Sequence, residues 1–221
     1  MSERSMILAS ISPRRRELIG LFNSPCQFIS ADVDETMQAD ERPDDLVRRL
    51  ARAKAEIGAQ QFAPRDAIII AADTIVSIDD VILGKPIDSD DAVRILKLLR
   101  NRPHIVYSGL TVMRGAQAIT QVVMTTVHMR GYSDAEIADY VATGDPLDKA
   151  AAYAIQHDGF RPVARIEGCH ANVMGLPLCH LYRALELFNV PVNEPDRVCQ
   201  AHLDIVCPVA REILGHGIND R

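Results

Sequence analysis

The sequence predicts an α/β fold in which helices flank a mixed sheet. Short apolar runs of strand length alternate along the chain with segments of helical periodicity. Of the 221 residues, 48% are hydrophobic and 24% are charged, so the chain has the composition of a globular protein with a sizeable core. No apolar run approaches the roughly 18 to 20 residues of a membrane helix, and the first is too short for a signal peptide. We therefore expect a cytoplasmic protein that does not enter membranes.

Seven apolar runs have the length and composition of strands, and two further runs are weaker candidates. The seven are residues 6–9, 26–30, 67–72, 75–78, 81–83, 104–114 and 117–129, and the weaker two are 152–156 and 163–167.

Five helices are predicted from their start signals and apolar spacing. The tail from Asn189 is richer in proline and polar residues, and we expect one or two short helices there. The five begin at Ser12-Pro13, Pro43, Ser89, Ser133 and Pro177, with Ser12, Ser89 and Ser133 as N-caps and Ser133 paired with Glu136 in a capping box. All but the second have predicted ends, near Phe22, Leu99, Gly144 and Phe188.

The charge balance disfavours a protein that coats nucleic acid, because 24 basic and 30 acidic residues leave a net charge of −6. The five cysteines are few, odd in number and without CxxC spacing, so reduced thiols are expected rather than disulfides. Two Cys-His pairs, at 169–170 and 179–180, lack the spacing of a zinc finger.

Three cations, Arg14 to Arg16, stand in the first turn of the predicted helix after Ser12. The helix dipole is positive at that end, so their placement is unfavourable unless an anion binds there. Free backbone N–H groups and arginine side chains together could cradle a phosphate. A solvated basic helix end explains the motif equally well.

Carboxylates are candidates for metal binding or for general base catalysis. Asp73, followed by Thr74, ends an apolar run, at the strand end where α/β sheets gather their ligands. The acidic loop at 32–42 offers Asp32, Asp34 and Glu35, one of which could join Asp73 around a divalent cation. A turn cap at Asp73 and a solubilising loop are the alternatives.

Two lysines and a late loop complete the candidates. Lys54 lies on the apolar face of its helix, so it either extends out to solvent or points inward toward an anion. Lys85, held between Gly84 and Pro86, could bind phosphate or could be an ordinary turn lysine. In the segment 144–156, Tyr153 and Gln156 could contact a base, or the tyrosine could simply pack. No Walker A motif, GxGxxG motif or nucleophile elbow is present.

Taken in order along residues 6–188, seven of these segments resemble the motifs of the Maf family of nucleotide pyrophosphatases. Each is modest evidence alone, but the ordered set is highly specific. They are ASISPRR at 9–15, VDE at 33–35, KA at 54–55, AADT at 71–74, GKP at 84–86, GDPLDKAAAYAIQ at 144–156 and NVMGLPL at 172–178.

The resemblance implies a fold similar to that of the inosine triphosphatases, with two lobes around a cleft. It implies hydrolysis of a nucleoside triphosphate to the monophosphate and pyrophosphate with Mg²⁺ or Mn²⁺, as nucleotide-pool house-cleaning. Asp73 would be the general base, Glu35 and Asp73 would hold the metal, and Lys85 would complete the catalytic set. The substrate-binding set would be Ser12, Arg14, Arg15, Lys54, Thr74, Lys149, Tyr153 and Gln156.

Within the family, Tyr153 and Gln156 look like the subgroup acting on dTTP and UTP, with Arg14, Thr74 and Gln156 tied to base preference. Ala151 departs from the family's usual glycine and would be strained if φ is positive there. His170 departs from a common aromatic residue. Residues 1–188 would form the family domain and 189–221 an extension without an assigned role.

Two other functions stay open. The chain could be a pyrophosphatase for a modified or purine nucleotide. It could also be a nucleotide-sensing regulator of cell division that binds without useful turnover. Members of the family often form homodimers, but the residues do not settle the oligomeric state.

Overall fold

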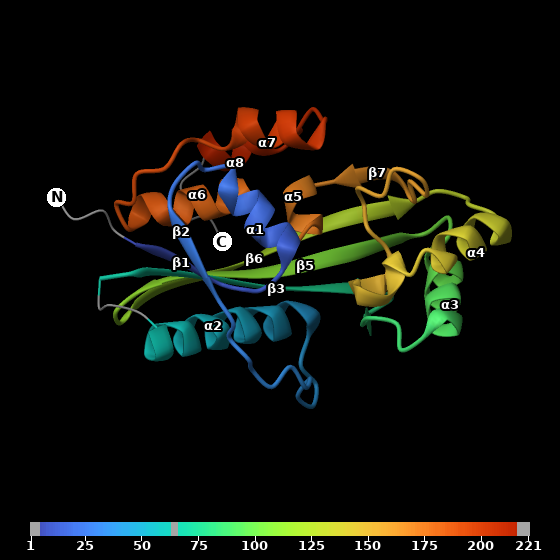
Figure 1. Cartoon of the computed structure of the whole chain (residues 1–221), viewed down its shortest axis with the longest axis horizontal. Coiled ribbons are helices and arrows are strands. Elements are labelled where there is room, and N and C mark those ends of the chain that lie inside the picture. The colour runs from blue at the N-terminus through green and yellow to red at the C-terminus, as the bar shows by residue number, and fades with distance from the viewer. Residues whose placement is uncertain (1–4, 63–65, 216–221) are drawn as a thin grey trace. The chain divides into compact units, whose positions relative to one another are not determined.

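The computed structural model describes residues 5–62 and 66–215 (Figure 1). The chain divides into two compact units. The first unit comprises residues 1–74, 108–123 and 169–221, and the second comprises 75–107 and 124–168. The two units correspond to the two predicted lobes, whereas the cleft expected with them stays a prediction.

In the described residues seven strands form one sheet, and the sheet is mixed, as predicted. Their order is β2-β1-β3-β5-β6-β7, and β4 pairs with β3. Strand β1 pairs in parallel with β2 and β3, whereas the pairs β3–β4 and β6–β7 are antiparallel. The strands are β1 (Met6–Ala9), β2 (Cys26–Ile29), β3 (Ile68–Ile78), β4 (Val81–Leu83), β5 (Pro103–Arg114), β6 (Gln117–Met129) and β7 (Val163–Glu167).

Two strand predictions were wrong. The runs at 67–72 and 75–78 belong to one strand, β3, because Asp73 and Thr74 continue the extended backbone and their side chains find polar partners. Residues 152–156 form no strand. Two short 3₁₀ segments, η1 (Asp145–Asp148) and η2 (Ala150–Ala152), precede turns there.

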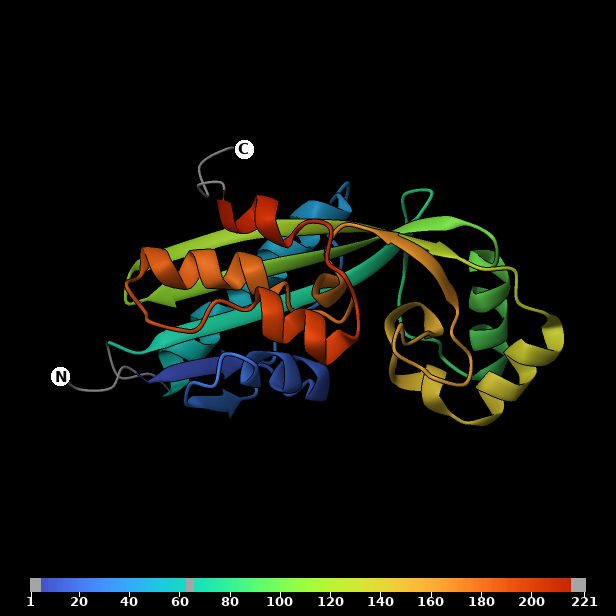
Figure 2. The same cartoon turned by 90° about the horizontal axis from the view of Figure 1, so that it is seen from above.

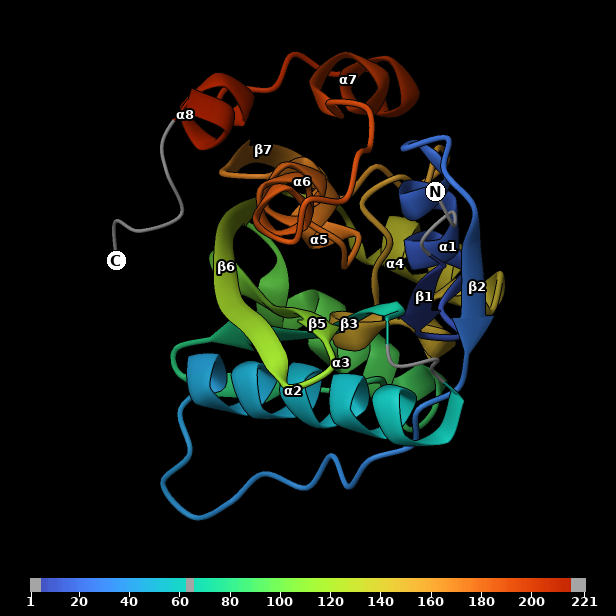
Figure 3. The same cartoon turned by 90° about the vertical axis from the view of Figure 1, so that its left-hand side faces the viewer.

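In the first unit, helices cover both faces of the sheet. Helix α2 lies on one face, and α1, α5 and α6 lie on the other (Figures 1 and 3). A Cβ at Gly109 on β5 would lie 2.0 Å from the carbonyl oxygen of Val47, so glycine lets α2 approach the sheet closely. The helices are α1 (Pro13–Gly20), α2 (Pro43–Phe62), α5 (His170–Val173) and α6 (Leu178–Leu187).

Helix ends differ in detail from the predictions. Helix α1 ends at Gly20 rather than Phe22, and Ser12 occupies its N-cap position without a side-chain capping bond. The third helix, α3 (Ser89–Leu99), is capped by Asp88 rather than Ser89, because the Asp88 carboxylate accepts a hydrogen bond from the Asp91 N–H.

The second unit contains α3 and α4 (Asp134–Ala142), both visible in Figure 2. The predicted capping box of Ser133 and Glu136 is present at the start of α4, and Gly144 follows its end with φ of 75°. Tyr140 stacks on Phe160 with ring centroids 4.4 Å apart.

The carboxyl-terminal tail forms two short helices, α7 (Asp196–Leu203) and α8 (Ala210–Gly215), beyond α6 (Figure 3). His202 Nε2 lies 2.8 Å from Glu17 Oε1 of α1, which links α7 to the first helix. A pocket under the tail is lined by four of the five cysteines, none of which forms a disulfide. Among residues 5–62 and 66–215, no helix combines the length and apolar composition of a membrane span.

Ala151 stands where the family usually has glycine, and its φ is positive. Its φ is 56° and ψ is 25°, its side chain is fully buried, and its N–H donates to the carbonyl oxygen of Gly84. A left-handed conformation costs a residue with a Cβ roughly 1–2 kcal/mol, and losing a buried methyl group costs about 0.8 kcal/mol.

We therefore expect Ala151→Gly to raise the melting temperature by about 1–3 °C, because relief of strain exceeds the lost methyl contact. Scanning calorimetry would measure this. Ala154→Gly is the matched control, because Ala154 is also buried but lacks a positive φ, and this variant should melt lower than the wild type. A lower melting temperature for Ala151→Gly would show that the backbone tolerates alanine without strain.

Candidate active site

Asp73 is a buried carboxylate on the α2 side of β3. The chain reaches it through the apolar run Ile68–Ala72, which is fully buried in the sheet. Asp73 itself is 7% exposed, and its Oδ1 lies 2.6 Å from Nζ of Lys54. A buried carboxylate requires such a partner, because an unpaired charge is costly to desolvate.

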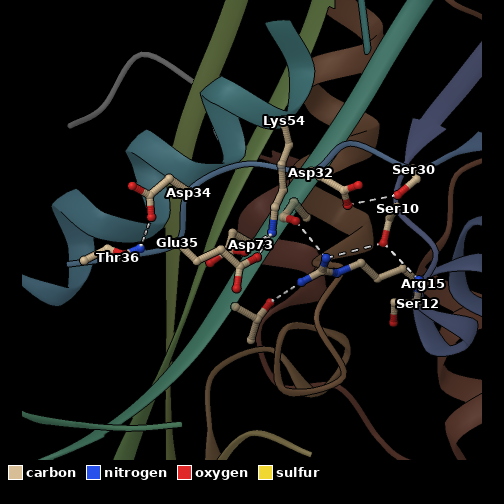
Figure 4. A network of polar contacts seen from close by, with 12 residues as sticks. Ser10, Ser12, Arg15, Ser30, Asp32, Asp34, Glu35, Thr36, Lys54 and Asp73 are labelled. Carbon is tan, nitrogen blue, oxygen red and sulfur yellow. Dashed lines mark hydrogen bonds and ion pairs between the residues drawn. The ribbon is translucent and has the colours of Figure 1, made fainter. Parts of the chain in front are cut away.

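Lys54 points inward and joins two carboxylates. Its Nζ lies 2.7 Å from Glu35 Oε1 as well as 2.6 Å from Asp73 Oδ1 (Figure 4). The Lys54 side chain is only 12% exposed, whereas that of Glu35 is 65% exposed. The Lys54 ammonium therefore holds the exposed carboxylate of Glu35 beside the buried carboxylate of Asp73.

The structure also distinguishes among the three acids of the loop. Asp32 accepts a hydrogen bond from the Ser30 hydroxyl, and Asp34 accepts one from the Thr36 N–H. The bonds from Thr36 hold the pKa of Asp34 below its usual value. Only Glu35 of the three contacts Lys54, and it is the acid that the family resemblance selected.

Arg15 is a clamp that connects four segments of the first unit. Its Nε donates to the carbonyl oxygen of Gly175 at 2.9 Å, and its Nη1 donates to the carbonyl oxygen of Ala72 at 2.7 Å. Nη1 also contacts Ser10 Oγ at 3.5 Å, and Nη2 donates to Thr74 Oγ1 at 3.1 Å. Burial lowers the pKa of Arg15, and the nearby charge of Asp73 opposes that shift. Arginine nevertheless stays protonated in proteins.

The amino terminus of α1 presents unused donors. The Arg14 side chain has no hydrogen bond or ion pair with any residue in the described part of the chain, and α1 has no acidic residue in its first turn. The Ser12 hydroxyl makes no capping bond, while the Ser12 N–H donates to Ser10 Oγ at 3.2 Å. This end of the helix is therefore suited to binding an anion.

Four predicted site residues lie in the second unit. Lys85 and Gln156 are exposed and make no hydrogen bond with the described residues. The Lys149 ammonium is buried and donates to the carbonyl oxygen of Asp145 and to the carboxylates of Asp145 and Asp148. These three bonds account for all three of its N–H groups.

Tyr153, the fourth, is also buried. Its hydroxyl lies 2.7 Å from His104 Nε2, and the two rings meet edge to face. Burial lowers the pKa of His104 to about 4 and raises that of Tyr153, so both groups are neutral at pH 7. Lys149 and Tyr153 are held by their own unit, and their contact with substrate stays a prediction.

Sequence reasoning missed three residues that support Arg15 and Thr74. Ser10 and Ser108 supply buried hydroxyl groups. Gly175 has φ of 99°, and a Cβ there would lie 3.2 Å from Arg15 Nε. A buried strand that contains a serine, as in Val106–Leu110, was the available signal for Ser108. Nothing local pointed to the contact between Arg15 and Gly175, which are 160 residues apart.

A family model described as Maf-like protein matches residues 5–188. The chain thus belongs to the Maf-like protein family. It is 46% identical over 188 residues to a protein of Dictyoglomus turgidum named dTTP/UTP pyrophosphatase, covering 84% of this chain and 96% of that protein. It is 45% identical over 186 residues to a protein of the same name from Geotalea uraniireducens, covering 83% and 95%.

Among solved structures, the Ham1 protein of Staphylococcus aureus is similar with a TM-score of 0.41 and 16% identity. That likeness covers 59% of this chain and 73% of the Ham1 chain.

Proposed function

We propose that this protein hydrolyses dTTP and UTP to the monophosphate and pyrophosphate. The observation that carries the proposal is the cluster of Asp73, Lys54 and Glu35 in a chain 46% identical to a protein named dTTP/UTP pyrophosphatase. Carboxylates for water activation and cations for phosphate binding are what hydrolysis of a phosphoanhydride requires.

Asp73 is the proposed general base. Lys54 contacts its Oδ1, and Oδ2 has no hydrogen-bond partner in the described part of the chain. Oδ2 can therefore accept a proton from the water that attacks the α-phosphorus. Burial in β3 fixes the direction of the carboxylate and limits competition from bulk water.

Asp73 and Glu35 fit a hard divalent cation, because both are oxygen donors and a single ammonium ion already contacts both. The described residues offer no group of three His, Cys, Asp or Glu ligands, so water and substrate phosphate oxygens would complete the coordination. A bound Mg²⁺ or Mn²⁺ would neutralise charge on the phosphates. The Lys54 side chain can turn its ammonium group from the carboxylates toward a phosphate oxygen of the substrate.

We also assign the phosphates to Arg14 and the amino terminus of α1, and the resemblance to the family assigns Lys85 to them as well. Arg14 has no competing partner among the described residues, whereas Arg15 uses four N–H···O contacts within the protein. A guanidinium has five N–H groups, so Arg15 keeps one for the substrate. Gln156, with both a donor and an acceptor, is the residue we assign to the base.

Pyrophosphate release from a panel of nucleoside triphosphates tests the proposal, with and without Mg²⁺ or Mn²⁺. Metal-dependent release that is greatest with dTTP and UTP supports it. Release that is greatest with a purine or modified nucleotide keeps the reaction and overturns the substrate. Nucleotide binding without release would favour a sensor of nucleotide over an enzyme.

Arg14→Ala is expected to lower kcat/KM about 10-fold or more, mainly through KM, because a charged phosphate contact is lost. Steady-state kinetics with dTTP would measure it. Arg16→Ala is the matched control for charge, because the Arg16 guanidinium covers the Phe28 ring at 4.9 Å and is not assigned to phosphate. Equal values of kcat/KM for the Arg14 variant and the wild type would remove Arg14 from the phosphate site.

A further inference from the structure

A row of hydrogen bonds connects Arg15 to the backbone of α5 through two hydroxyl groups. Arg15 Nη2 donates to Thr74 Oγ1 at 3.1 Å, and Thr74 Oγ1 lies 2.8 Å from Ser108 Oγ. Ser108 Oγ in turn donates to the carbonyl oxygen of Asn172 at 3.3 Å. Ser108 and Asn172 are fully buried, and all four residues belong to the first unit.

The geometry sets the direction of these bonds. A serine hydroxyl has one proton, so if Ser108 donates to Asn172 it must accept from Thr74. The row then runs from Arg15 through Thr74 and Ser108 to Asn172, with three bonds formed. If Ser108 instead donated to Thr74, only two bonds would form and the Thr74 proton would lose its acceptor. The three-bond arrangement is preferred because buried polar groups favour the larger number of hydrogen bonds.

The direction determines what Thr74 offers to a ligand. The Thr74 hydroxyl donates its proton to Ser108, and one of its two lone pairs accepts the bond from Arg15. Only its second lone pair remains for a ligand. Thr74 is half-buried, whereas Ser108 is inaccessible. An oxygen with only a lone pair repels phosphate oxygens and attracts an N–H or O–H group.

We propose that Ser108 is a positioning residue that keeps Thr74 as a hydrogen-bond acceptor toward the nucleotide. This inference rests on the proposed function, because it assumes a nucleotide in this site. The ligand group that contacts Thr74 is therefore a hydrogen-bond donor. In a pyrimidine nucleotide that donor is either the imide N–H of the base or a hydroxyl group of the sugar.

The test compares wild type, Ser108→Ala, Ser108→Thr and Thr74→Val. Dissociation constants are measured by calorimetry for the non-hydrolysable α,β-methylene analogue of UTP. Its N3-methyl form lacks the imide donor, and its 2′-deoxy and 3′-deoxy forms each lack a sugar donor. Pyrophosphate release is measured in parallel with UTP and dTTP.

In the wild type, removing the ligand N–H or O–H group that donates to Thr74 should weaken binding about 10-fold or more. We call this ratio of the two dissociation constants the discrimination. Thr74→Val should reduce that discrimination to within about twofold. Ser108→Ala should reduce it several-fold, because the Thr74 proton is then free to turn toward the ligand. Ser108→Thr keeps the hydroxyl group and should restore the discrimination. The analogue that shows the effect identifies the base or the sugar as the donor.

Thr111→Val is the matched control, because Thr111 also lies on β5, is fully buried and pairs with the hydroxyl of Thr120 at 3.0 Å. It should lose stability without changing the discrimination. If Ser108→Ala weakens binding of every analogue by the same factor, Ser108 has only a structural role and the proposal is overturned. Should both Ser108 variants fail to fold, an unchanged discrimination in Thr74→Val would overturn it equally.

The wild-type results separate this inference from the proposed function. If the wild type binds the UTP analogue but releases no pyrophosphate, the proposed function fails while the discrimination still tests Ser108. If it binds no nucleotide at all, both are overturned.

Discussion

Replacing Asp73 by asparagine should lower kcat about 100-fold or more, which is the usual contribution of a positioned general base. Asparagine keeps the size of the side chain but cannot take a proton from water. The Lys54 ammonium would then face one carboxylate, Glu35, instead of two. Both the base and half of the candidate metal site are lost in one substitution. Single-turnover release of pyrophosphate from dTTP would measure the effect on chemistry.

Asp32→Asn is the matched control for Asp73→Asn. Asp32 is an exposed acid of the neighbouring loop, and it accepts its hydrogen bond from the Ser30 hydroxyl rather than from Lys54. The control should keep turnover within about twofold of the wild type. Melting temperatures of both variants would separate lost chemistry from lost structure. If Asp73→Asn folds normally and turns over at the wild-type rate, the base must be sought elsewhere.

Strands β1, β3 and β5 could be predicted from sequence because their apolar runs are largely buried within the sheet. The exception at Asp73 is instructive. A local reading ends the strand at the first acid, whereas β3 continues through it to Ile78. Lys54, 19 residues away on α2, neutralises the carboxylate and lets the strand continue with an acid in its middle. Such compensation from a distant element has no local signal in one sequence.

Lys54 illustrates the same limit within the candidate site. Its place on the apolar face of a helix left two orientations open, outward to solvent or inward to an anion. The structure shows the inward one, with protein carboxylates as the anions. Sequence position therefore identified the unusual lysine but could not identify its partners, because Glu35 and Asp73 come from separate segments.

The predicted strand at 152–156, which follows Ala151, was wrong for a different reason. Its run of alanine, tyrosine and isoleucine has strand-like composition, yet Ala151 and Ala152 both adopt positive φ. A strand requires negative φ throughout. The absence of glycine removed the usual sequence signal for a turn, and only the family resemblance indicated that the position was special.

Arg15→Lys is expected to lower the free energy of unfolding by about 3 kcal/mol, because lysine cannot reproduce the fork of a guanidinium. Arg15 joins α1 to β3 and to the turn at Gly175 through directed bonds. A lysine ammonium at that point could reach one or two of the acceptors. The remaining carbonyl and hydroxyl groups would lose a partner in a part-buried site. Urea denaturation without nucleotide would measure the loss.

Arg14→Lys is the matched control, because Arg14 is the preceding residue of the same helix and has no partner among the described residues. Its stability without nucleotide should equal that of the wild type within about 0.5 kcal/mol. The comparison separates two roles for Arg15 that the motif alone could not. A residue that only binds phosphate lowers stability on replacement only when nucleotide is present, through the lost binding energy. A clamp lowers it in the free protein as well. Unchanged stability of nucleotide-free Arg15→Lys would therefore show that the contacts with Gly175, Ala72 and Thr74 are dispensable, and that Arg15 acts on substrate alone.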